Sequence, residues 1–239
     1  MTTNFYAPPS AIRGRRVVLP DEEARHVRSV LRARAGDEIV VVDGEGGWYR
    51  VRLDHLAPEQ VVGTVQETRR DVGEPEVHVT VGLGLLTKRS RFETFVEKAV
   101  ELGVGGIVPL HTARTETDTF RAERIRNVMI AALKQCRRSR LPTLTDPRSL
   151  SSVLDASTAD RRLVCHGETE GAPLRRSLDG LTAGEHVLVL VGPEGGFTGD
   201  EVEAVTDGGG TAVSLGPRRL RAETAGIVAV AAATVGGEA

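Results

Sequence analysis

Hydrophobic positions along the chain follow two different spacings, and the change between them falls near residue 73. Before it, apolar and β-branched residues form short alternating runs separated by turn residues, which predicts strands over 16–19, 38–43, 48–53 and 60–67. Between the first two runs, Val27, Val30 and Leu31 recur at helical spacing and predict a short helix over 22–32. The pattern indicates a small β-barrel with one inserted helix.

After a polar stretch at 69–75, predicted strands and helices alternate. Apolar runs predict strands over 77–81, 105–110, 162–166, 187–191 and 211–215. Helical periodicity predicts helices over 91–102, 121–137, 200–206 and 222–235. Val187–Val191 is apolar at every position, which fits a strand buried on both faces. Because such alternation is typical of a parallel α/β sheet, we predict two domains, residues 1–72 and 73–239.

Composition excludes several classes of protein. With 239 residues and 40% hydrophobic residues the chain can bury a sizeable core, which excludes a disordered chain. Its two cysteines, Cys136 and Cys165, exclude a disulfide scaffold and favour the reducing cytoplasm. The first ten residues contain no apolar segment, so we expect no signal peptide. The weakly apolar 225–237 stretch is too short to cross a bilayer.

Positive charge is distributed unevenly along the chain. The formal charge is −2, yet residues 73–150 carry 13 basic and 9 acidic side chains, whereas 151–239 carry 7 and 13. Of the 31 basic residues 28 are arginine, which binds phosphate through a bidentate fork. Charge alone leaves two interpretations open: ordinary solvated faces, or local patches that bind nucleic acid.

The sequence argues against several common active sites. Gly82 and Gly84 follow a predicted strand, but a dinucleotide site also needs a suitably placed acidic residue, which is missing. Neither a phosphate-binding Gly-Lys-Ser/Thr triplet nor a Gly-x-Ser-x-Gly nucleophile motif occurs. The six histidines are scattered and the cysteines are unpaired, so no metal site is expected.

Two glycine-containing loops near the C-terminus are stronger candidates. Residues 192–197, Gly-Pro-Glu-Gly-Gly-Phe, follow the apolar strand that ends at Val191. Residues 215–225 place three arginines and a glutamate between a strand and a helix. Glycine lets a ligand approach the backbone closely, and α/β proteins bind ligands at the carboxyl ends of parallel strands. Two such loops together favour a ligand site.

Five motifs in this order resemble those of the RsmE family, the small-subunit ribosomal RNA uridine N3-methyltransferases of the SPOUT class. The resemblance spans nearly the whole chain. The motifs are His26-x-x-x-Val30-Leu31-Arg32-x-x-x-Gly36-Asp37, Lys88-x-x-Arg91-x-Glu93 with Lys98-Ala99-x-Glu101-Leu102-Gly103-Val104, Gln135-x-x-Arg138 with Pro142, Gly192-Pro193-Glu194-Gly195-Gly196-Phe197, and Leu220-Arg221-Ala222-Glu223-Thr224-Ala225.

The resemblance implies a PUA-like β-barrel that binds RNA, followed by a SPOUT α/β domain with a deep C-terminal trefoil knot. It also implies a homodimer that acts on 16S ribosomal RNA or the small ribosomal subunit. S-adenosylmethionine would be the co-substrate, held by the knot loops, with no metal. The implied cofactor-binding residues are His166, Gly167, Gly192, Glu194, Gly195, Gly196, Leu215, Gly216, Leu220, Arg221, Glu223, Thr224 and Ala225.

Methylation of uracil N3 requires removal of a weakly acidic proton or stabilisation of the resulting anion. Arg221 is the expected stabiliser of that charge. Glu194 and Glu223 are the candidate proton acceptors, and the alternative role for each is to cap backbone amides or hold ribose hydroxyls. Six basic residues are expected to hold RNA phosphates: Arg28, Arg32, Lys88, Arg91, Arg137 and Arg138. Two alternatives remain: a SPOUT enzyme acting on transfer RNA or a ribose 2′-hydroxyl, and an RNA-binding protein without catalysis.

Overall fold

The computed structural model describes residues 4–166 and 172–235, and the chain divides into two compact units. The N-terminal unit comprises residues up to Glu74 together with Ile130–Leu141, and the C-terminal unit comprises Pro75–Met129 and the residues from Pro142 onward. The sequence placed all of 73–239 in one domain. The structure instead assigns the segment Ile130–Leu141 to the first unit, so the division falls within helix α3 (Ala122–Cys136).

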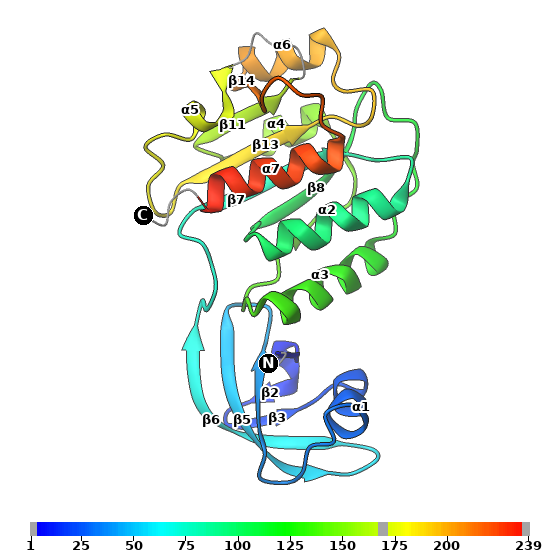
Figure 1. The fold of residues 1–239 in the computed structure, drawn as a ribbon, viewed down its shortest axis with the longest axis vertical. Helices are drawn as coiled ribbons and strands as arrows, with labels where there is room; N and C mark the ends of the chain where they lie inside the picture. Colours follow the sequence, from blue (N-terminus) through cyan, green and yellow to red (C-terminus); the bar gives the residue numbers. More distant parts are fainter. Residues whose placement is uncertain (1–3, 167–171, 236–239) are drawn as a thin grey trace. The chain divides into compact units, whose positions relative to one another are not determined.

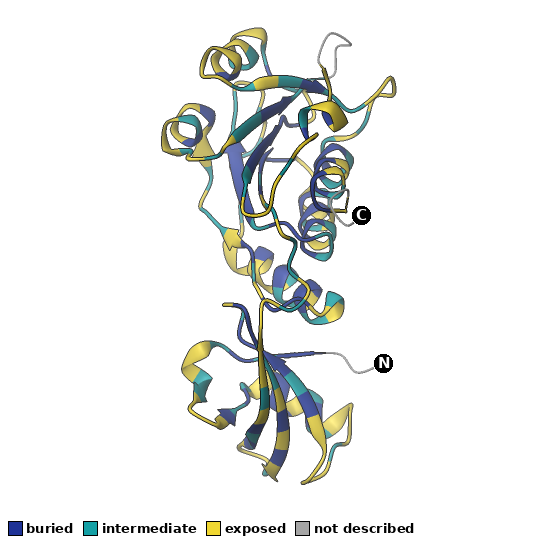
Figure 2. Cartoon of the chain, turned by 90° about the vertical axis from the view of Figure 1, so that its left-hand side faces the viewer, coloured by how far each residue is buried: buried dark blue, intermediate teal, exposed yellow. Residues whose placement is uncertain are grey.

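A six-stranded curled sheet forms the N-terminal unit (Figure 1). The long strands β5 and β6 pair antiparallel, with bulges at Arg50/Val51 and Leu53/His55 that bend the ribbon. Buried and exposed side chains alternate along these strands, so one face encloses an apolar core (Figure 2). In sheet order the strands are β1 (Phe5–Tyr6), β4 (Glu38–Val42), β5 (Gly47–Leu56), β6 (Val61–Arg70), β3 (Arg16–Val18) and β2 (Ile12–Arg13).

The inserted helix is shorter than its hydrophobic spacing predicts. Helix α1 spans Asp21–Ser29 and buries Ala24 and Val27, but it ends before Val30. The chain then turns through Arg32, whose φ of +53° lies in the left-handed region. Val30 is 71% exposed and Leu31 48% exposed, so this apolar pair lies on the surface.

The C-terminal unit contains an eight-stranded sheet whose described strands all pair in parallel, as predicted. Strand β13, the all-apolar run, lies between β7 and β11, and five of its six residues are buried. In sheet order the strands are β10 (Arg148–Ser149), β8 (Gly106–His111), β7 (His78–Gly84), β13 (His186–Val191), β11 (Arg161–Cys165), β14 (Thr211–Ser214) and β12 (Ala172–Pro173), with β9 (Thr143–Leu144) also on β8.

Helices cover both faces of this sheet. Helices α2 (Arg89–Glu101) and α7 (Ala222–Thr234) lie side by side on one face (Figure 1). Gly226 of α7 packs directly on Phe95 of α2, because a Cβ at Gly226 would lie 2.6 Å from the Phe95 ring. The opposite face packs on α4 (Leu150–Ala156) and α6 (Gly199–Asp207), while α5 (Leu174–Ser177) is a single turn. None of the described helices is long and apolar enough to cross a membrane.

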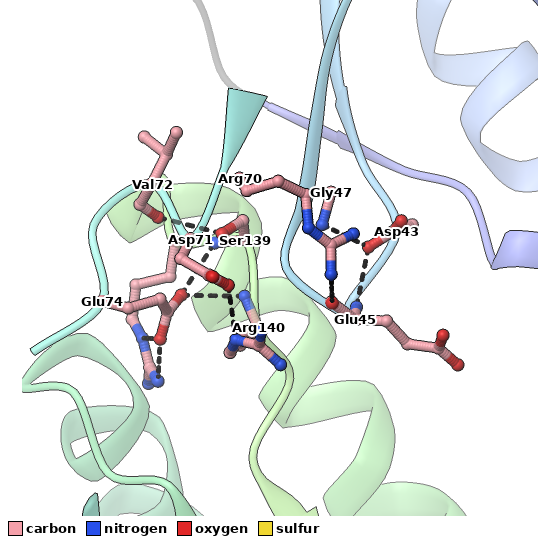
Figure 3. Close-up of polar contacts among 10 residues, drawn as sticks. Asp43, Glu45, Gly47, Arg70, Asp71, Val72, Glu74, Ser139 and Arg140 are labelled. Atoms are coloured by element: carbon pink, nitrogen blue, oxygen red, sulfur yellow. Dashed lines mark hydrogen bonds and ion pairs between the residues drawn. The ribbon is translucent and has the colours of Figure 1, made fainter. Parts of the chain in front are cut away.

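A polar network that is buried only in part joins two segments of the N-terminal unit (Figure 3). Glu74 receives hydrogen bonds from the backbone N–H groups of Ser139 and Arg140, at 3.0 and 2.8 Å. Its other oxygen accepts hydrogen bonds from Arg138 Nε and Nη2, at 3.1 and 2.7 Å. Asp71 accepts a 2.6 Å hydrogen bond from Arg140 Nε. These contacts attach the segment 137–141 to a turn more than 60 residues earlier in the chain.

Candidate active site

Loops from four strands, together with the end of a fifth, lie at one edge of the C-terminal sheet. Because the strands are parallel, all their carboxyl ends lie at that edge. The loops that follow β7, β8, β13 and β14 begin at Leu85, Thr112, Gly192 and Leu215, and β11 ends at Cys165. The glycine loop 192–197 and the turn before α7 therefore lie at the same edge, as the sequence indicated.

The loop 192–197 is shaped by its glycines. The Gly196 N–H donates a 2.9 Å hydrogen bond to the Pro193 carbonyl, and Gly196 has φ +71°, a region that favours glycine. At Gly192 a Cβ would lie 2.7 Å from the backbone carbon of Gly196. Gly84, at the end of β7, allows Pro193 to pass against it, since a Cβ there would overlap the Pro193 ring and nitrogen. The glycines of the Gly82-x-Gly84 motif thus serve packing rather than dinucleotide binding.

Glu194 and Glu223 are held by the first turn of α2 and the loop before it. The Thr87 N–H and hydroxyl donate hydrogen bonds to Glu194 Oε1, at 3.2 and 2.8 Å. Arg91 forms ion pairs with both carboxylates, 3.9 Å from Glu194 and 3.7 Å from Glu223. Arg91 was expected to bind phosphate, but in the structure it joins the two loops, because both carboxylates lie within its reach. Glu223 is only 8% exposed.

Arg114 is a site residue that the sequence analysis missed. It lies in the loop after β8 and donates hydrogen bonds to the carbonyl oxygens of Gly195 and Phe197, at 2.7 and 3.2 Å. The neighbouring Ala113 N–H donates to Glu201, whose carboxylate also completes a capping box with Thr198 at the start of α6. The only available signal was the position of Arg114 just beyond the carboxyl end of a predicted strand.

The turn before α7 presents three exposed arginines, Arg218, Arg219 and Arg221, and none of them forms a hydrogen bond or ion pair with a residue that the structure describes. Gly216 has φ +105°, which allows the chain to reverse after β14. Arg221 is the N-cap residue of α7 and is exposed, and its guanidinium hydrogen-bonds no residue in the described part of the chain. Leu215, Leu220 and Thr224 are half-buried, and Ala225 is buried. The guanidinium of Arg221 is therefore available to a ligand.

The end of β11 contributes His166, whose backbone N–H donates to the Val213 carbonyl at 3.1 Å. This bond places His166 beside β14, next to the turn that begins at Leu215. Gly167, a predicted cofactor-binding residue, lies outside the described residues. Burial raises the pKa of the Cys165 thiol to about 12, so this thiol stays protonated and is a poor nucleophile.

The six predicted RNA-binding residues have different surroundings. Lys88 caps α2 and is exposed, and Arg32 and Arg137 are also exposed. Arg137 has φ +66°, a left-handed conformation directly after the last residue of α3. These three cations remain free to meet phosphate.

One predicted RNA contact, Arg138, needs correction, and another, Arg28, also makes a contact within the protein. Arg138 is 3% exposed, and its guanidinium is engaged by Glu74, so it does not face solvent. Arg28 is half-buried, and its Nη1 donates a 2.6 Å hydrogen bond to the Ala57 carbonyl. Arg138 therefore serves the N-terminal unit, because a buried guanidinium must have its donors satisfied, whereas half-buried Arg28 stays a candidate RNA contact.

Family models match both units of the chain. A model described as an RNA methyltransferase domain matches residues 73–234, and one described as an RNA methyltransferase PUA domain matches residues 19–66. The first match alone covers more than half of the chain.

Individual relatives agree with the family models. The chain is 30% identical to the ribosomal RNA small subunit methyltransferase E of Bacillus subtilis, over 88% of this chain and 86% of the relative. It is 34% identical to the enzyme of that name from Mycobacterium bovis, over 97% and 90%. The crystal structure of the Neisseria gonorrhoeae enzyme of that name, bound to S-adenosyl methionine, superposes with a TM-score of 0.86 at 29% identity, covering 97% and 96%.

Proposed function

Because the chain belongs to the RsmE family of small-subunit ribosomal RNA methyltransferases, we propose that it transfers a methyl group from S-adenosylmethionine to N3 of one uridine in 16S ribosomal RNA. One observation carries this proposal. The 192–197 loop and the turn before α7, which contains the exposed Arg221, both lie at the carboxyl edge of the sheet. Family membership supports the proposed reaction, and the residues at this edge support its location.

The residues at this edge fit S-adenosylmethionine. Gly195 and Gly196 expose backbone without side chains, and half-buried Leu215 and Leu220 supply apolar surface for an adenine ring. Glu194 and Glu223 supply negative charge beside a cationic sulfonium. When bound, S-adenosylmethionine supplies an electrophilic methyl group, so the reaction as proposed needs no metal.

Arg221 and Glu194 take the catalytic roles in this proposal. The Arg221 guanidinium would stabilise the negative charge that develops on the uracil ring as N3 loses its proton. Glu194 would accept that proton: both Thr87 hydrogen bonds reach Oε1, whereas no described residue hydrogen-bonds Oε2. Arg91 would fix the two carboxylates relative to each other, and Arg114 would hold the backbone of the 192–197 loop.

The proposal includes a trefoil knot, a homodimer and a cytoplasmic location. The knot is proposed from membership of the family. The location follows from the substrate, since ribosomal subunits are assembled in the cytoplasm. Within the α/β unit, α7 keeps Val228 (38% exposed) and Val235 (60% exposed) on the surface, which supports a partner on this helix.

We expect Val228→Asp to convert a dimer into a monomer, because a charge at a contact between copies must be desolvated. Multi-angle light scattering at micromolar concentration measures the mass of both forms. The small residues of α7 are used by packing on α2 within the chain, so Val228 is a cleaner probe than Ala229 or Gly226. A monomeric unaltered chain would contradict the dimer.

Loss of Arg32 and Arg137 is expected to weaken binding of ribosomal RNA and flatten its salt dependence. Each lost phosphate contact lowers the slope of log K against log salt by about one. Arg32→Gln and Arg137→Gln remove the charges, and Arg52→Gln is the matched control, because Arg52 is exposed in the same unit but lies beside Asp54 at 3.4 Å. Filter binding from 50 to 300 mM salt measures the slopes. Equal slopes for all variants would contradict a phosphate role.

The decisive test of the reaction is to methylate small ribosomal subunits from a strain that lacks the modification. Purified chain and isotopically labelled S-adenosylmethionine are added, and nucleosides from the digested RNA are identified by mass spectrometry. We expect labelled 3-methyluridine at a single position. Label on a ribose, or only on transfer RNA, would contradict the proposed substrate, and absence of S-adenosylmethionine binding would favour an RNA-binding protein without catalysis.

A further inference from the structure

A cavity opens beside the candidate active site, within the C-terminal unit. Its volume is about 270 Å³. Its floor is apolar, made by Leu85, Leu86, Phe92 and Ile125, all of which are 5% exposed or less. Half-buried Phe120 forms part of the wall and meets the Phe92 ring edge-to-face, with ring centroids 6.0 Å apart. The cavity therefore offers an aromatic surface of the kind on which nucleobases stack.

The mouth of this cavity is positively charged. Arg89, Arg121 and Arg124 line it together with one carboxylate, Glu93. Arg124 uses Nε and Nη2 to bind Glu93, at 3.2 and 2.8 Å, and this contact lowers the pKa of Glu93. The guanidinium groups of Arg89 and Arg121 are exposed and hydrogen-bond no residue in the described part of the chain. Two exposed cations thus flank an apolar, aromatic cavity, and one of them, Arg89, is close enough to Glu93 to contribute to its lowered pKa.

The two cations are placed where a polyanion is favoured. Arg89 is the first residue of α2, and Arg121 directly precedes α3 (Figure 1). The N-termini of helices of this length carry partial positive charge and attract phosphate. The apolar floor, the aromatic wall and the paired helix starts together match an unstacked nucleotide, with its base inward and its phosphates at the mouth.

The cavity is connected to the candidate active site through one short segment. Leu85 and Leu86 line the cavity, and the next residue, Thr87, holds Glu194 of the 192–197 loop. The lining offers little to read or deprotonate a uracil edge: its one carboxylate is occupied by Arg124, which leaves the Thr119 hydroxyl. A base bound here would be close to the reaction without being its target.

We propose that this cavity binds the base of a nucleotide that flanks the target uridine in the ribosomal RNA, stacked on Phe120, with the adjacent phosphates on Arg89 and Arg121. The inference rests on the proposed function, because it requires an RNA substrate. This subsite would hold the RNA strand on the Thr87 side of the candidate active site. The target base would lie at the 192–197 loop and the turn before α7. Stacking on an aromatic ring depends little on which base is bound, so the subsite would position the RNA rather than recognise its sequence.

Steady-state kinetics test the subsite directly. Phe120→Leu keeps apolar volume but removes the aromatic face, and Arg121→Gln removes one cation. We expect each to raise the KM for unmodified small subunits, Phe120→Leu by about 5- to 150-fold, the range for one lost base–aromatic stack. The turnover number at saturating subunits and the Kd for S-adenosylmethionine should be unchanged. Arg126→Gln is the matched control, since Arg126 is exposed on α3 and lies outside the cavity.

Crosslinking identifies the occupant. With p-benzoylphenylalanine in place of Phe120, irradiation of the complex with small subunits should join residue 120 to a nucleotide one or two positions from the methylated uridine. A crosslink to the target uridine itself, or to a second copy of the chain, would overturn the proposal, as would monomerisation of Phe120→Leu in light scattering. If the unaltered chain methylates subunits while Phe120→Leu and Arg121→Gln behave like Arg126→Gln, the subsite alone is wrong. If the unaltered chain methylates no ribosomal RNA, the proposed function fails first.

Discussion

Replacing Arg221 with alanine is expected to lower the turnover number for RNA methylation by about 10²–10³-fold, the usual cost of losing a donor aimed at developing negative charge. The structure supports a large and specific effect, because the Arg221 guanidinium hydrogen-bonds no described residue and so contributes little to the fold. Single-turnover methylation of unmodified small subunits measures the chemical step. The Tm should change by less than about 1 °C, since for a chain of this size a change of about 1 kcal/mol shifts Tm by only about 2–4 °C.

Two variants make the Arg221 result interpretable. Arg221→Lys keeps the positive charge but lacks the planar guanidinium that donates two parallel hydrogen bonds. It should therefore have a turnover number between those of Arg221→Ala and the unaltered chain. Arg218→Ala removes an equally exposed arginine from the same turn and should retain nearly full turnover. RNA affinity should be similar in all three proteins. Full activity of Arg221→Ala would remove this residue from the mechanism.

Arg138→Met is expected to lower the free energy of unfolding of the N-terminal unit by roughly 3–5 kcal/mol, since it leaves the Glu74 carboxylate buried without its cation. The side chains of Arg138 and Glu74 are 4% and 10% exposed and are joined by two hydrogen bonds. Trp48, the single tryptophan, lies in β5 of the same unit, so its fluorescence during urea unfolding reports on this unit.

Arg140→Ala is the control for this loss. Arg140 and Asp71 form an ion pair in the same network, but both side chains are 48% exposed, so solvent screens the contact. The expected change is about 0–1 kcal/mol. Equal effects of the two substitutions would show that burial does not determine the contribution of Arg138. Retained stability in Arg138→Met would return Arg138 to the set of candidate RNA contacts.

The alternation of strands and helices in the C-terminal half could be predicted because burial on both faces leaves a clear signature. Val187–Val191 is apolar throughout, and the structure places it in the middle of the parallel sheet. Helix α4 was not predicted, since its seven residues contain only two turns and bury only Leu150 and Val153. Short elements of this kind are set by the neighbours they pack on, which a local pattern does not contain.

The candidate site shows the same division between local and distant information. The loop 192–197 and the turn before α7 could be located because glycine spacing and strand ends are local features. The roles of Arg91 and Arg138 could not, because each is fixed by a carboxylate far away in the sequence: Glu194 and Glu223 for Arg91, Glu74 for Arg138. A charged side chain reveals its charge in the sequence, but its partner only in the fold.

Residues 130–141 belong to the N-terminal unit although they are made after part of the C-terminal unit. This arrangement determines when each unit can be completed during synthesis. Glu74 and Arg138 are separated by 64 positions, so a ribosome that adds 5–20 residues per second needs about 3–13 s to make the second after the first. Throughout that interval the nascent N-terminal unit lacks the segment that neutralises Glu74. The unit encoded first is therefore completed only after residue 141 of 239 has emerged, when more than half of the chain exists. Folding during synthesis therefore begins with the N-terminal unit, but this unit cannot be completed before residues 130–141 have been made.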